Sequence, residues 1–406
     1  MALNVKVGLI GLFDMLKFKK MGQAREDWVQ HAPADEIKTT FPINVNAKKL
    51  HPDYQELVVD KVVDYDKAGA KMFVFKRQGG GKPANFRAGQ YLSLKLEIDG
   101  SAVTRPYSIC STPKEATKDG KVAITVKTNP GGFVADELLA NLKKGDKVIA
   151  SDPQGQFYYE DLRDAKNVIA LAGGSGITPF LSMAGAIAEG TEDFNLTILF
   201  GSRTEEVILF KDELAKLEKA SKGKVKVVHI LSDEEKSGYE HGFISADIIK
   251  KYAPKSGEYS IYVCGPEAMY KFAEKEVAKL KLPKRLVRNE LLGVTKDVTK
   301  DPKYKGKADK TYTVTVKQAG QKEVQIPAAA NETLLVAFER AGIKAPSRCR
   351  SGECGWCRSQ LTDGKVFIPE ATDGRRESDK RWNTIHPCAT FPLSDCTVEV
   401  PGEYWK

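Results

Sequence analysis

The spacing of apolar and polar residues changes twice along this chain of 406 residues. From about residue 51 to 155, short apolar runs alternate with turn signals, a pattern typical of a small antiparallel β-barrel. The strands expected from these runs are residues 58–59, 72–75, 91–94 and 122–126, and turns are expected at Gly79-Gly80-Gly81 and Asp99-Gly100.

From residue 160 to 290, strand-like runs alternate with helical segments, which predicts a parallel sheet covered by helices. The expected strands are residues 168–171, 196–200, 225–230 and 260–263, and a helix is expected from Glu267 to about Leu280. Ligands of such sheets bind beyond the carboxyl ends of the strands, where Gly173, Gly201 and Cys264 fall. His229 lies within an apolar strand and is interpreted as a core or interface residue.

A third pattern begins after residues 294–310, which are rich in lysine and poor in apolar residues. Such a segment predicts a solvated tether, although its charge could also steer an acidic partner. A hairpin of strands 312–316 and 323–326 is expected next, followed by a helix that Asn331 caps and that runs through Arg340. The predicted parts are an extension over 1–50, a β-barrel over 51–158, an α/β domain over 159–293, the linker over 294–310 and an α+β (β-grasp) domain over 311–406.

The N-terminal extension has helix-compatible apolar spacing over residues 5–18, with Lys17, Lys19 and Lys20 in and after it. A helix of this kind could lie on a membrane surface or on a partner, through residues 5–20. A helix that packs on the chain's own core is the favoured interpretation. Asp14 interrupts the apolar run and no small-residue cleavage site follows, which argues against a signal peptide. No run reaches the length of a membrane span, so we expect a cytoplasmic protein.

Composition narrows the function classes. The net charge of +9 is spread along the chain, without a basic cluster interleaved with aromatic residues, so nucleic-acid binding is not expected. The hydrophobic content of 41% and the charged content of 29% are ordinary for a globular protein. There are seven cysteines, of which Cys110, Cys264 and Cys396 are interpreted as reduced thiols of a reducing compartment.

The other four cysteines have the spacing of a plant-type [2Fe–2S] cluster. Four residues separate Cys349 from Cys354, two separate Cys354 from Cys357, and thirty separate Cys357 from Cys388. The short loop can wrap three thiolates around one cluster, and its small residues let backbone N–H groups approach the sulfurs. Structural zinc usually requires two matched pairs of ligands, and a disulfide framework suits a short secreted domain. The spacing therefore favours an iron–sulfur cluster.

Three further motifs offer groups that bind phosphates and flat rings. Arg105-Pro106-Tyr107-Ser108 supplies a cation, an aromatic ring and a hydroxyl, and Gly131-Gly132-Phe133 opens a predicted helix whose free N–H groups could hold a phosphate. The strand at 168–171 runs into Gly173-Gly174-Ser175-Gly176-Ile177-Thr178, where glycines permit a tight turn before a helix. This is not the GxGxxG fingerprint, and by itself it could equally be a structural turn.

Together these motifs resemble the ferredoxin–NADP reductase superfamily, and specifically its three-part members with a flavin barrel, a nicotinamide domain and a C-terminal plant-type ferredoxin. Reductase components of phthalate- and phenylacetate-type oxygenases share that order. The resemblance covers about residues 51–406. Four motifs carry it and occur in the family's order: Arg105-Pro106-Tyr107-Ser108, the glycine turn that begins at Gly173, Cys264-Gly265-Pro266 and the four cysteines.

The resemblance implies a role for each matching residue. Arg105 would bind the flavin phosphate, Tyr107 would stack on the isoalloxazine ring, and Ser108 would lie near flavin N5. The remaining residues implied to bind flavin are Pro106, Lys127, Gly131, Gly132 and Phe133. Those implied to bind the nicotinamide dinucleotide are Gly173, Gly174, Gly176, Thr178, Arg203, Cys264, Gly265 and Pro266. Ser108, Cys264 and Glu290 would act at the reacting rings, and Cys349, Cys354, Cys357 and Cys388 would hold the iron.

The implied activity is transfer of a hydride from NADH to FAD, and then of single electrons through the [2Fe–2S] cluster to a separate protein such as an oxygenase, a demethylase or another metalloenzyme. FAD is favoured over FMN because it is the commoner cofactor of the family. NADH is favoured over NADPH because Asp233, Glu234 and Glu235 would repel a 2′-phosphate that Arg203 could otherwise meet. An electron-entry subunit of a membrane-associated complex, docked through residues 5–20, and a redox sensor are the alternatives.

Two positions depart from the family's pattern. Many relatives carry a serine or threonine where this chain has Ala135, so a hydroxyl contact to the phosphate is missing. Leucines 291 and 292 follow Glu290 where relatives often have an aromatic residue near the flavin. The group that covers this side of the flavin is therefore not predicted.

Overall fold

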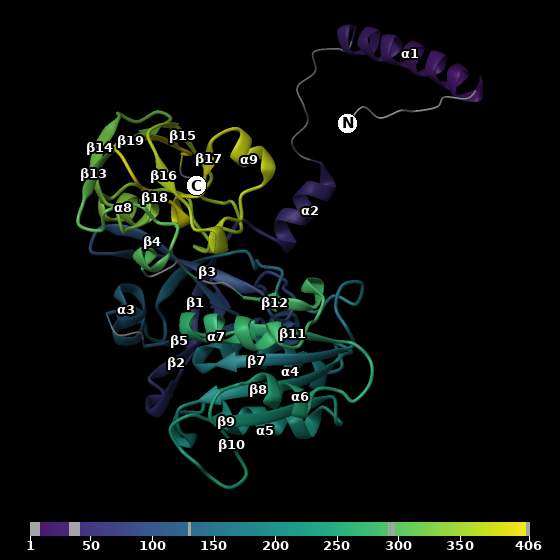
Figure 1. The fold of residues 1–406 in the computed structure, drawn as a ribbon, viewed down its shortest axis with the longest axis vertical. Coiled ribbons are helices and arrows are strands. Elements are labelled where there is room, and N and C mark those ends of the chain that lie inside the picture. Colours follow the sequence, from purple (N-terminus) through teal and green to yellow (C-terminus); the bar gives the residue numbers. More distant parts are fainter. Residues whose placement is uncertain (1–8, 32–40, 129–130, 291–292, 294–296, 403–406) are drawn as a thin grey trace. The chain divides into compact units, whose positions relative to one another are not determined.

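The structure, a computed structural model, describes residues 9–31, 41–128, 131–290, 293 and 297–402 (Figure 1). The chain divides into two compact units, Met1–Ala47 and Lys48–Lys406. In the first unit, α1 (Leu9–Gln30) is a helix whose exposed apolar side chains include Leu12, Phe13 and Leu16. The predicted helix is thus present from Leu9, and its first residues lie outside the described part. No helix among the described residues has the length and apolarity to cross a bilayer.

The second unit begins within α2 (Pro42–Leu50) and continues into an antiparallel sheet. This sheet has the order β4-β3-β6-β1-β2-β5, and it curls so far that a single isolated bridge, between Ile109 and Ile124, connects its two edges. The strands are β1 (Tyr54–Tyr65), β2 (Ala70–Arg77), β3 (Tyr91–Ile98), β4 (Ser101–Ser108), β5 (Lys121–Lys127) and β6 (Lys147–Ser151). The strand pattern missed β4 and β6, because Arg105 and Pro106 interrupt the first and the second is short.

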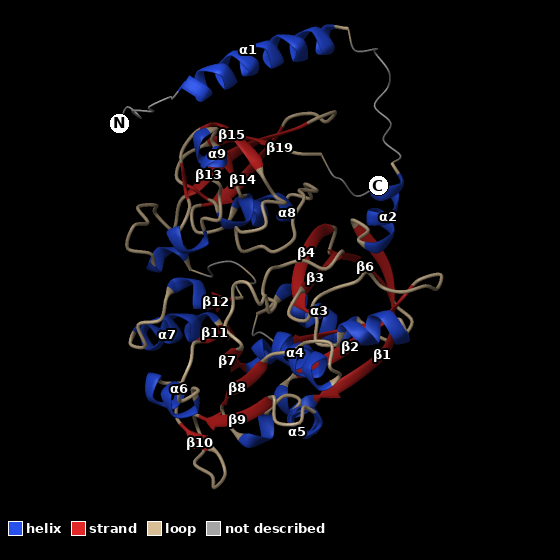
Figure 2. Ribbon diagram, turned by 90° about the vertical axis from the view of Figure 1, so that its right-hand side faces the viewer, coloured by secondary structure: helices blue, strands red, loops and turns tan. Residues whose placement is uncertain are grey.

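The α/β part forms a parallel sheet of order β10-β9-β8-β7-β11-β12 with helices on both faces (Figure 2). Its strands are β7 (Asn167–Gly173), β8 (Asn195–Ser202), β9 (Val225–Leu231), β10 (Glu240–His241), β11 (Tyr259–Cys264) and β12 (Val287–Asn289). Its helices are α4 (Thr178–Ala188), α5 (Lys211–Ala220), α6 (Ala246–Tyr252) and α7 (Glu267–Ala278). The strand order reverses at β7, which lies between β8 and β11, and open sheets bind ligands at this kind of switch point.

The C-terminal part is a mixed sheet of order β14-β13-β19-β15-β17, with a small second sheet of β16 and β18. The strands are β13 (Thr311–Gln318), β14 (Val324–Ala329), β15 (Ser359–Asp363), β16 (Val366–Phe367), β17 (Thr384–Ile385), β18 (Phe391–Pro392) and β19 (Cys396–Val400). The helices are α8 (Leu334–Arg340) and α9 (Glu377–Arg381). The prediction that Asn331 caps α8 was wrong, because the Thr333 side chain accepts the N–H of Val336.

Two of the three parts of this unit share an apolar core, and the third does not. Ala70 and Ala123 of the curled sheet belong to the same apolar cluster as Val168, Phe180 and Tyr262 of the α/β part. In the C-terminal part, all residues of the main core lie between positions 314 and 400. Apolar packing therefore joins the first two parts, whereas the third has a core of its own.

The described part of the lysine-rich segment packs on the protein and is not a free tether. Val298 is fully buried, and Tyr304 donates its hydroxyl to the carbonyl of Ala330 at 2.7 Å. The Tyr304 ring also packs edge-on against Phe367, with 5.4 Å between ring centroids. The expectation of a solvated linker is corrected on this point, because two apolar side chains among the lysines attach the segment to the folded part.

Candidate functional site

The cysteine loop between α8 and β15 directs backbone N–H groups at its sulfurs. The Sγ of Cys349 lies 3.4 Å from the backbone nitrogens of Ser351 and of Cys354, and the Sγ of Cys354 lies 3.5 Å from the nitrogen of Trp356. Such N–H···S contacts stabilise thiolates and tune the potential of an iron–sulfur cluster. The loop thus has the local geometry that its small residues predicted.

The fourth cysteine reaches the loop from a segment far along the chain. Cys388 follows β17, and its Sγ lies 3.4 Å from the Sγ of Cys357. Hydrogen bonds from Cys354 and Cys388 lower the pKa of the Cys349 thiol, which favours its thiolate, the form that binds iron. Among the described residues, no three histidine, cysteine, aspartate or glutamate side chains are grouped so that they could hold one metal ion. A [2Fe–2S] cluster shares its four thiolates between two irons, and this donor set fits it.

Strand β4 presents the predicted flavin residues. Arg105 pairs with Leu94 of β3 and Tyr107 with Leu92, so their side chains share one face of the pleated strand. Burial lowers the pKa of Arg105 to about 10 and raises the pKa of Tyr107. Ser108 is buried where the strand ends, with Pro106 between the other two residues. A cation and a ring on one face can contact the phosphate and the ring system of one flavin.

The helix after β5 opens without a side-chain cap among the described residues. Gly132 precedes α3 (Phe133–Asn141), and it has no side chain that could accept the first N–H groups of the helix. Gly131 has a φ of +72° with open space beside its Cα, which a bulkier residue would restrict. The helix start therefore leaves backbone donors for a phosphate. Ala135 in its first turn supplies no hydroxyl, so the contact would rely on backbone N–H groups, which fits the departure noted in the sequence.

Two loops meet at the switch point of the parallel sheet. A Cβ on Gly176 would lie 2.1 Å from the carbonyl oxygen of Cys264, and one on Gly173 would lie 3.1 Å from the Cδ of Pro266. Gly174 and Gly265 belong to the same two loops. Only glycines allow backbones to approach so closely, and they lie at the switch point, where open parallel sheets bind dinucleotides. The hydroxyl of Thr178 donates to Ser175 at 2.9 Å, so it stabilises the turn itself.

Lys127, at the end of β5, reaches the nucleotide loop. Its Nζ lies 3.6 Å from the position that a Cβ on Gly174 would take, and burial lowers the pKa of its amine. Phe133, by contrast, is half exposed at the start of α3. One cation of the curled sheet thus lies beside the predicted pyrophosphate turn. Asn129 and Pro130, between Lys127 and the glycines, lie outside the described residues.

Glu290 is a strongly perturbed carboxyl near these loops. Its backbone N–H bonds to the carbonyl of Val263 at 2.9 Å, which places it beside the end of β11. Its Oε1 is buried and has no hydrogen-bond partner among the described residues. Burial raises the pKa of the carboxyl, and the negative charges of Glu353 and Cys349 add to this effect. Burial also raises the pKa of the Cys264 thiol, which is therefore neutral.

A buried carboxyl oxygen that lacks a partner is a position where a ligand group fits. Glu290 thus remains a candidate at the reacting rings. The two leucines at positions 291 and 292, where the sequence departs from the family's pattern, lie outside the described residues.

Tyr91 lies near both Ser108 and Glu290, which no sequence motif indicated. Tyr91 pairs with Ser108 across β3 and β4, and its ring lies 2.9 Å from where a Cβ on Gly155 would stand. The same position is 4.0 Å from the Oε1 of Glu290. Tyr91 is buried, which raises the pKa of its phenol. The fold thus places Glu290 in the neighbourhood of Tyr91, which pairs with Ser108 at the end of the flavin strand.

Arg203 lies at the end of β8, where a dinucleotide ribose would be expected. Its Nε donates to the carboxylate of Asp233 at 2.8 Å, and its side chain is 82% exposed. The hydroxyl of Ser232 also donates to Asp233, at 2.7 Å. Arg203, which the sequence offered as a ligand for a 2′-phosphate, is thus paired with a carboxylate.

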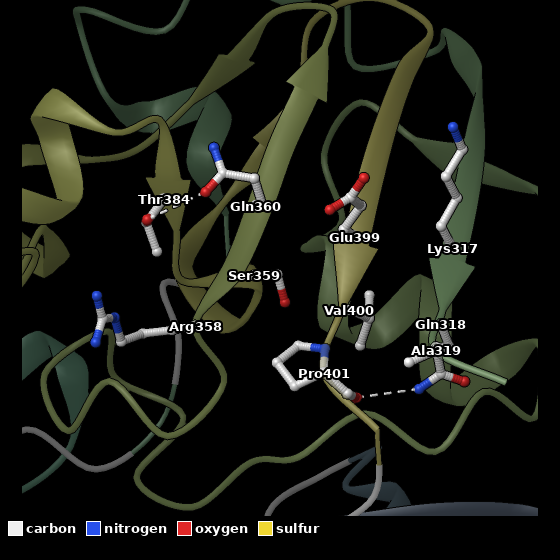
Figure 3. Close-up of a pocket in the computed structure, with 10 residues that line it drawn as sticks. All are labelled: Lys317, Gln318, Ala319, Arg358, Ser359, Gln360, Thr384, Glu399, Val400 and Pro401. Carbon is white, nitrogen blue, oxygen red and sulfur yellow. Dashed lines mark hydrogen bonds between the residues drawn. The ribbon is translucent and has the colours of Figure 1, made fainter.

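A separate surface cavity of about 590 Å³ opens on the C-terminal sheet (Figure 3). Its lining includes Lys317, Arg358, Gln360 and Glu399, and Gln318 donates to the carbonyl of Pro401 at 3.3 Å. The described residues that line it include none of the predicted flavin, nucleotide or iron ligands. The cavity is therefore distinct from the redox site assembled above.

Three family models match the chain in order. An oxidoreductase FAD-binding domain matches residues 62–159, an oxidoreductase NAD-binding domain matches residues 170–275, and a 2Fe-2S iron-sulfur cluster binding domain matches residues 316–393. These matches confirm the predicted cofactor classes, namely FAD, a nicotinamide dinucleotide and a [2Fe–2S] cluster.

Similar proteins match most of the chain. The ferredoxin reductase component of 3-ketosteroid-9-alpha-monooxygenase from Mycobacterium tuberculosis is 30% identical over 359 residues, which are 85% of this chain and 95% of that protein. The glycine betaine monooxygenase reductase subunit from Pseudomonas aeruginosa is 28% identical over 326 residues, covering 77% of this chain and 87% of that protein. The solved structure of phthalate dioxygenase reductase has the same fold, with a TM-score of 0.60 and 24% identity over 89% of this chain and all of that one. The chain therefore belongs to the ferredoxin–NADP reductase superfamily, among the reductases that join an FAD-binding domain, an NAD-binding domain and a C-terminal [2Fe–2S] domain.

Proposed function

We propose that this protein takes a hydride from NADH and delivers single electrons, through FAD and a [2Fe–2S] cluster, to a separate protein acceptor. The observation that carries the proposal is the grouping of the three binding regions in one compact unit, with the cysteine loop next to the flavin-binding part. When bound, the flavin would accept an electron pair and the cluster would accept single electrons, so together they convert a two-electron donor into a one-electron supply.

The residues of the chain would bind and orient the cofactors. Arg105 and Tyr107 would hold the flavin phosphate and ring, with Ser108 beside the reacting nitrogen. Backbone N–H groups after Gly131 would complete the phosphate site. At the switch point, the glycine turn at 173–176 would hold the pyrophosphate of the dinucleotide and direct its nicotinamide ring towards the flavin.

Cys264 and Glu290 would act at the nicotinamide side of the flavin. Burial raises the pKa of each side chain, which favours their neutral forms. A neutral carboxyl can donate a hydrogen bond or hold a proton at its Oε1, and a neutral thiol adds a small apolar surface. Their shared burial would also exclude water from the path of the hydride.

NADH is the proposed donor because Arg203 already forms an ion pair with Asp233. The carboxylate holds the guanidinium at 2.8 Å, and its negative charge would repel the 2′-phosphate of NADPH. The proposed acceptor is a separate oxygenase component. This follows from the names of the relatives, which are reductase components of oxygenases.

An anaerobic titration with NADH, and then with NADPH, tests the proposal. Visible absorbance follows the flavin, and low-temperature EPR follows the cluster. We expect flavin bleaching and then a rhombic signal from the reduced cluster, with NADH acting at lower concentration. The Cys354→Ser variant is expected to bleach its flavin with NADH but to lose the cluster signal and the reduction of a one-electron protein acceptor. Reduction of that acceptor at the wild-type rate would place the cluster off the path.

A second candidate is an electron-entry subunit of a membrane-associated complex. It is favoured by the exposed apolar side chains of Leu12, Phe13 and Leu16 on α1, which Lys17 and Lys19 follow. Full-length protein and a Phe13→Asp/Leu16→Asp variant can be compared by cell fractionation. Membrane association that the variant loses would support this candidate, and identical distribution of the two proteins would remove it.

A further inference from the structure

Arg348, the residue before the first cluster cysteine, bridges the [2Fe–2S] domain and the FAD-binding domain. Its side chain is only 2% exposed. Its Nη2 donates to the backbone carbonyl of Asp53 at 3.0 Å, and its Nη1 forms an ion pair with the carboxylate of Asp152. Asp53 directly precedes β1, and Asp152 directly follows β6. One guanidinium therefore binds two neighbouring segments of the flavin-binding sheet.

The same guanidinium also rests on the cysteine loop. Its central carbon lies 3.6 Å from the ring centroid of Trp356, and the ring of Tyr54 is 5.4 Å away. Trp356 stands between Cys354 and Cys357, and its backbone N–H points at the Sγ of Cys354. Stacking on an indole and hydrogen bonding through both terminal nitrogens fix the plane of a guanidinium. Arg348 thereby fixes both the orientation of the cysteine loop and its distance from the flavin-binding sheet.

A second polar link crosses between these two domains. Arg105 of β4 has its Nη1 3.9 Å from the Oε1 of Glu339 in α8. Glu339 also holds Arg350 of the cysteine loop, through two buried hydrogen bonds. The FAD-binding and NAD-binding domains, by contrast, share one apolar core. Directional polar contacts at the cysteine loop therefore position the [2Fe–2S] domain, whose main core is separate.

We propose that Arg348, through Asp152 and Trp356, is a positioning residue that sets the geometry between the flavin and the cluster. This inference rests on the proposed function. Electron transfer between centres falls steeply with distance, so a loop that is free to shift would pass electrons more slowly. A purely structural ion pair would instead affect folding or cluster retention and leave the rate between the centres unchanged in the protein that retains both.

The test compares Arg348→Gln, Asp152→Asn and the double variant with the wild type. Arg285→Gln is the matched control, because Arg285 makes an exposed ion pair with Glu258 inside the NAD-binding domain. Anaerobic stopped-flow mixing with NADH follows flavin reduction and cluster reduction separately. We expect flavin reduction near the wild-type rate in all variants, and cluster reduction about 10- to 100-fold slower in both single variants. The double variant should be no slower than Arg348→Gln, since the two residues act through one contact.

A second measurement does not depend on turnover. Hydrogen exchange of the resting protein, followed by mass spectrometry, should rise at residues 346–357 and 52–54 in both single variants and stay unchanged in Arg285→Gln. Asp152 lies outside the cysteine loop, so Asp152→Asn keeps the proposal testable if Arg348→Gln fails to retain its cluster.

Cluster reduction at the wild-type rate in Asp152→Asn, or single effects that add in the double variant, would overturn the proposal. Unchanged exchange in both segments would do the same. A wild-type cluster that NADH never reduces would refute the proposed function instead, and the exchange data would still decide whether Arg348 holds the loop.

Discussion

The buried ion pair between Arg350 and Glu339 gives the sharpest stability prediction. Their side chains are 4% and 8% exposed, and the Nη2 of Arg350 lies 3.1 Å from the Oε2 of Glu339. Replacing Glu339 with glutamine would leave the guanidinium of Arg350 buried without a counter-charge. Arg105, 3.9 Å from the same carboxylate, would lose its partner too. Removing one partner of a buried pair typically costs about 3–5 kcal/mol of unfolding free energy.

For the [2Fe–2S] domain, we therefore expect Glu339→Gln to lower the free energy of unfolding by about 3 kcal/mol. With a urea slope of about 1–3 kcal/mol per molar, this moves the unfolding midpoint down by roughly 1–3 M. Loss of the visible absorbance of the cluster during urea titration is the assay. The matched control is Glu323→Gln, because Glu323 pairs with Lys317 at 3.6 Å and both side chains are half exposed. Its effect should stay below about 0.5 kcal/mol.

Equal midpoints for Glu339→Gln and Glu323→Gln would refute this reasoning. Such a result would mean that water reaches the pair or that the loop rearranges to solvate Arg350. The magnitude rests on both side chains remaining buried once the carboxylate charge is gone.

Three further predictions concern the nucleotide side. Gly176→Ala would place a methyl group 2.1 Å from the Cys264 carbonyl oxygen, so the loops must separate, and kcat/KM for NADH should fall at least about 10-fold in ferricyanide assays. Asp233→Asn would release Arg203 and remove a repelling charge, so kcat/KM for NADPH should rise about 10-fold in the same assay. Burial lowers the pKa of His229 to about 4 in the folded protein. Between this value and the usual histidine pKa of 6.5, the unfolded chain therefore binds a proton on His229 that the folded protein does not bind. Stability should therefore fall as the pH drops from 6.5 towards 4, by about 2 kcal/mol at most for this partly buried ring, and His229→Gln should remove that part of the fall in thermal unfolding.

Each of these has a clear contrary result. Unchanged NADH kinetics in Gly176→Ala would mean that the two loops do not pack as described. An unaltered preference between NADH and NADPH in Asp233→Asn would mean that Asp233 does not select the donor. An equal loss of stability in wild type and His229→Gln between about pH 7 and pH 5 would mean that other groups account for the acid sensitivity.

The order of the domains and the chemistry of each could be predicted from the residues alone. The four cysteines could be assigned because three of them lie within nine residues, and the geometry of such a loop depends on local spacing. Four strands of the parallel sheet, β7, β8, β9 and β11, could be located because buried strands read as continuous apolar runs, whereas the short strands β10 and β12 were not predicted. The glycine turn after β7 could also be predicted, because its glycines directly follow a predicted strand. Its contact with Cys264 could not be predicted.

Features that depend on residues far apart in the chain became visible only in the folded protein. Arg348 and Asp152 are separated by 196 positions, and nothing near either of them in sequence indicates the pair. Strand β4 was missed because its edge position tolerates Arg105 and Pro106, which break the apolar pattern. Val298 and Tyr304 attach the described part of the segment 294–310 to the folded part, although its many lysines predicted a solvated tether. In each case the cause is burial against a distant surface, which no local pattern of residues records.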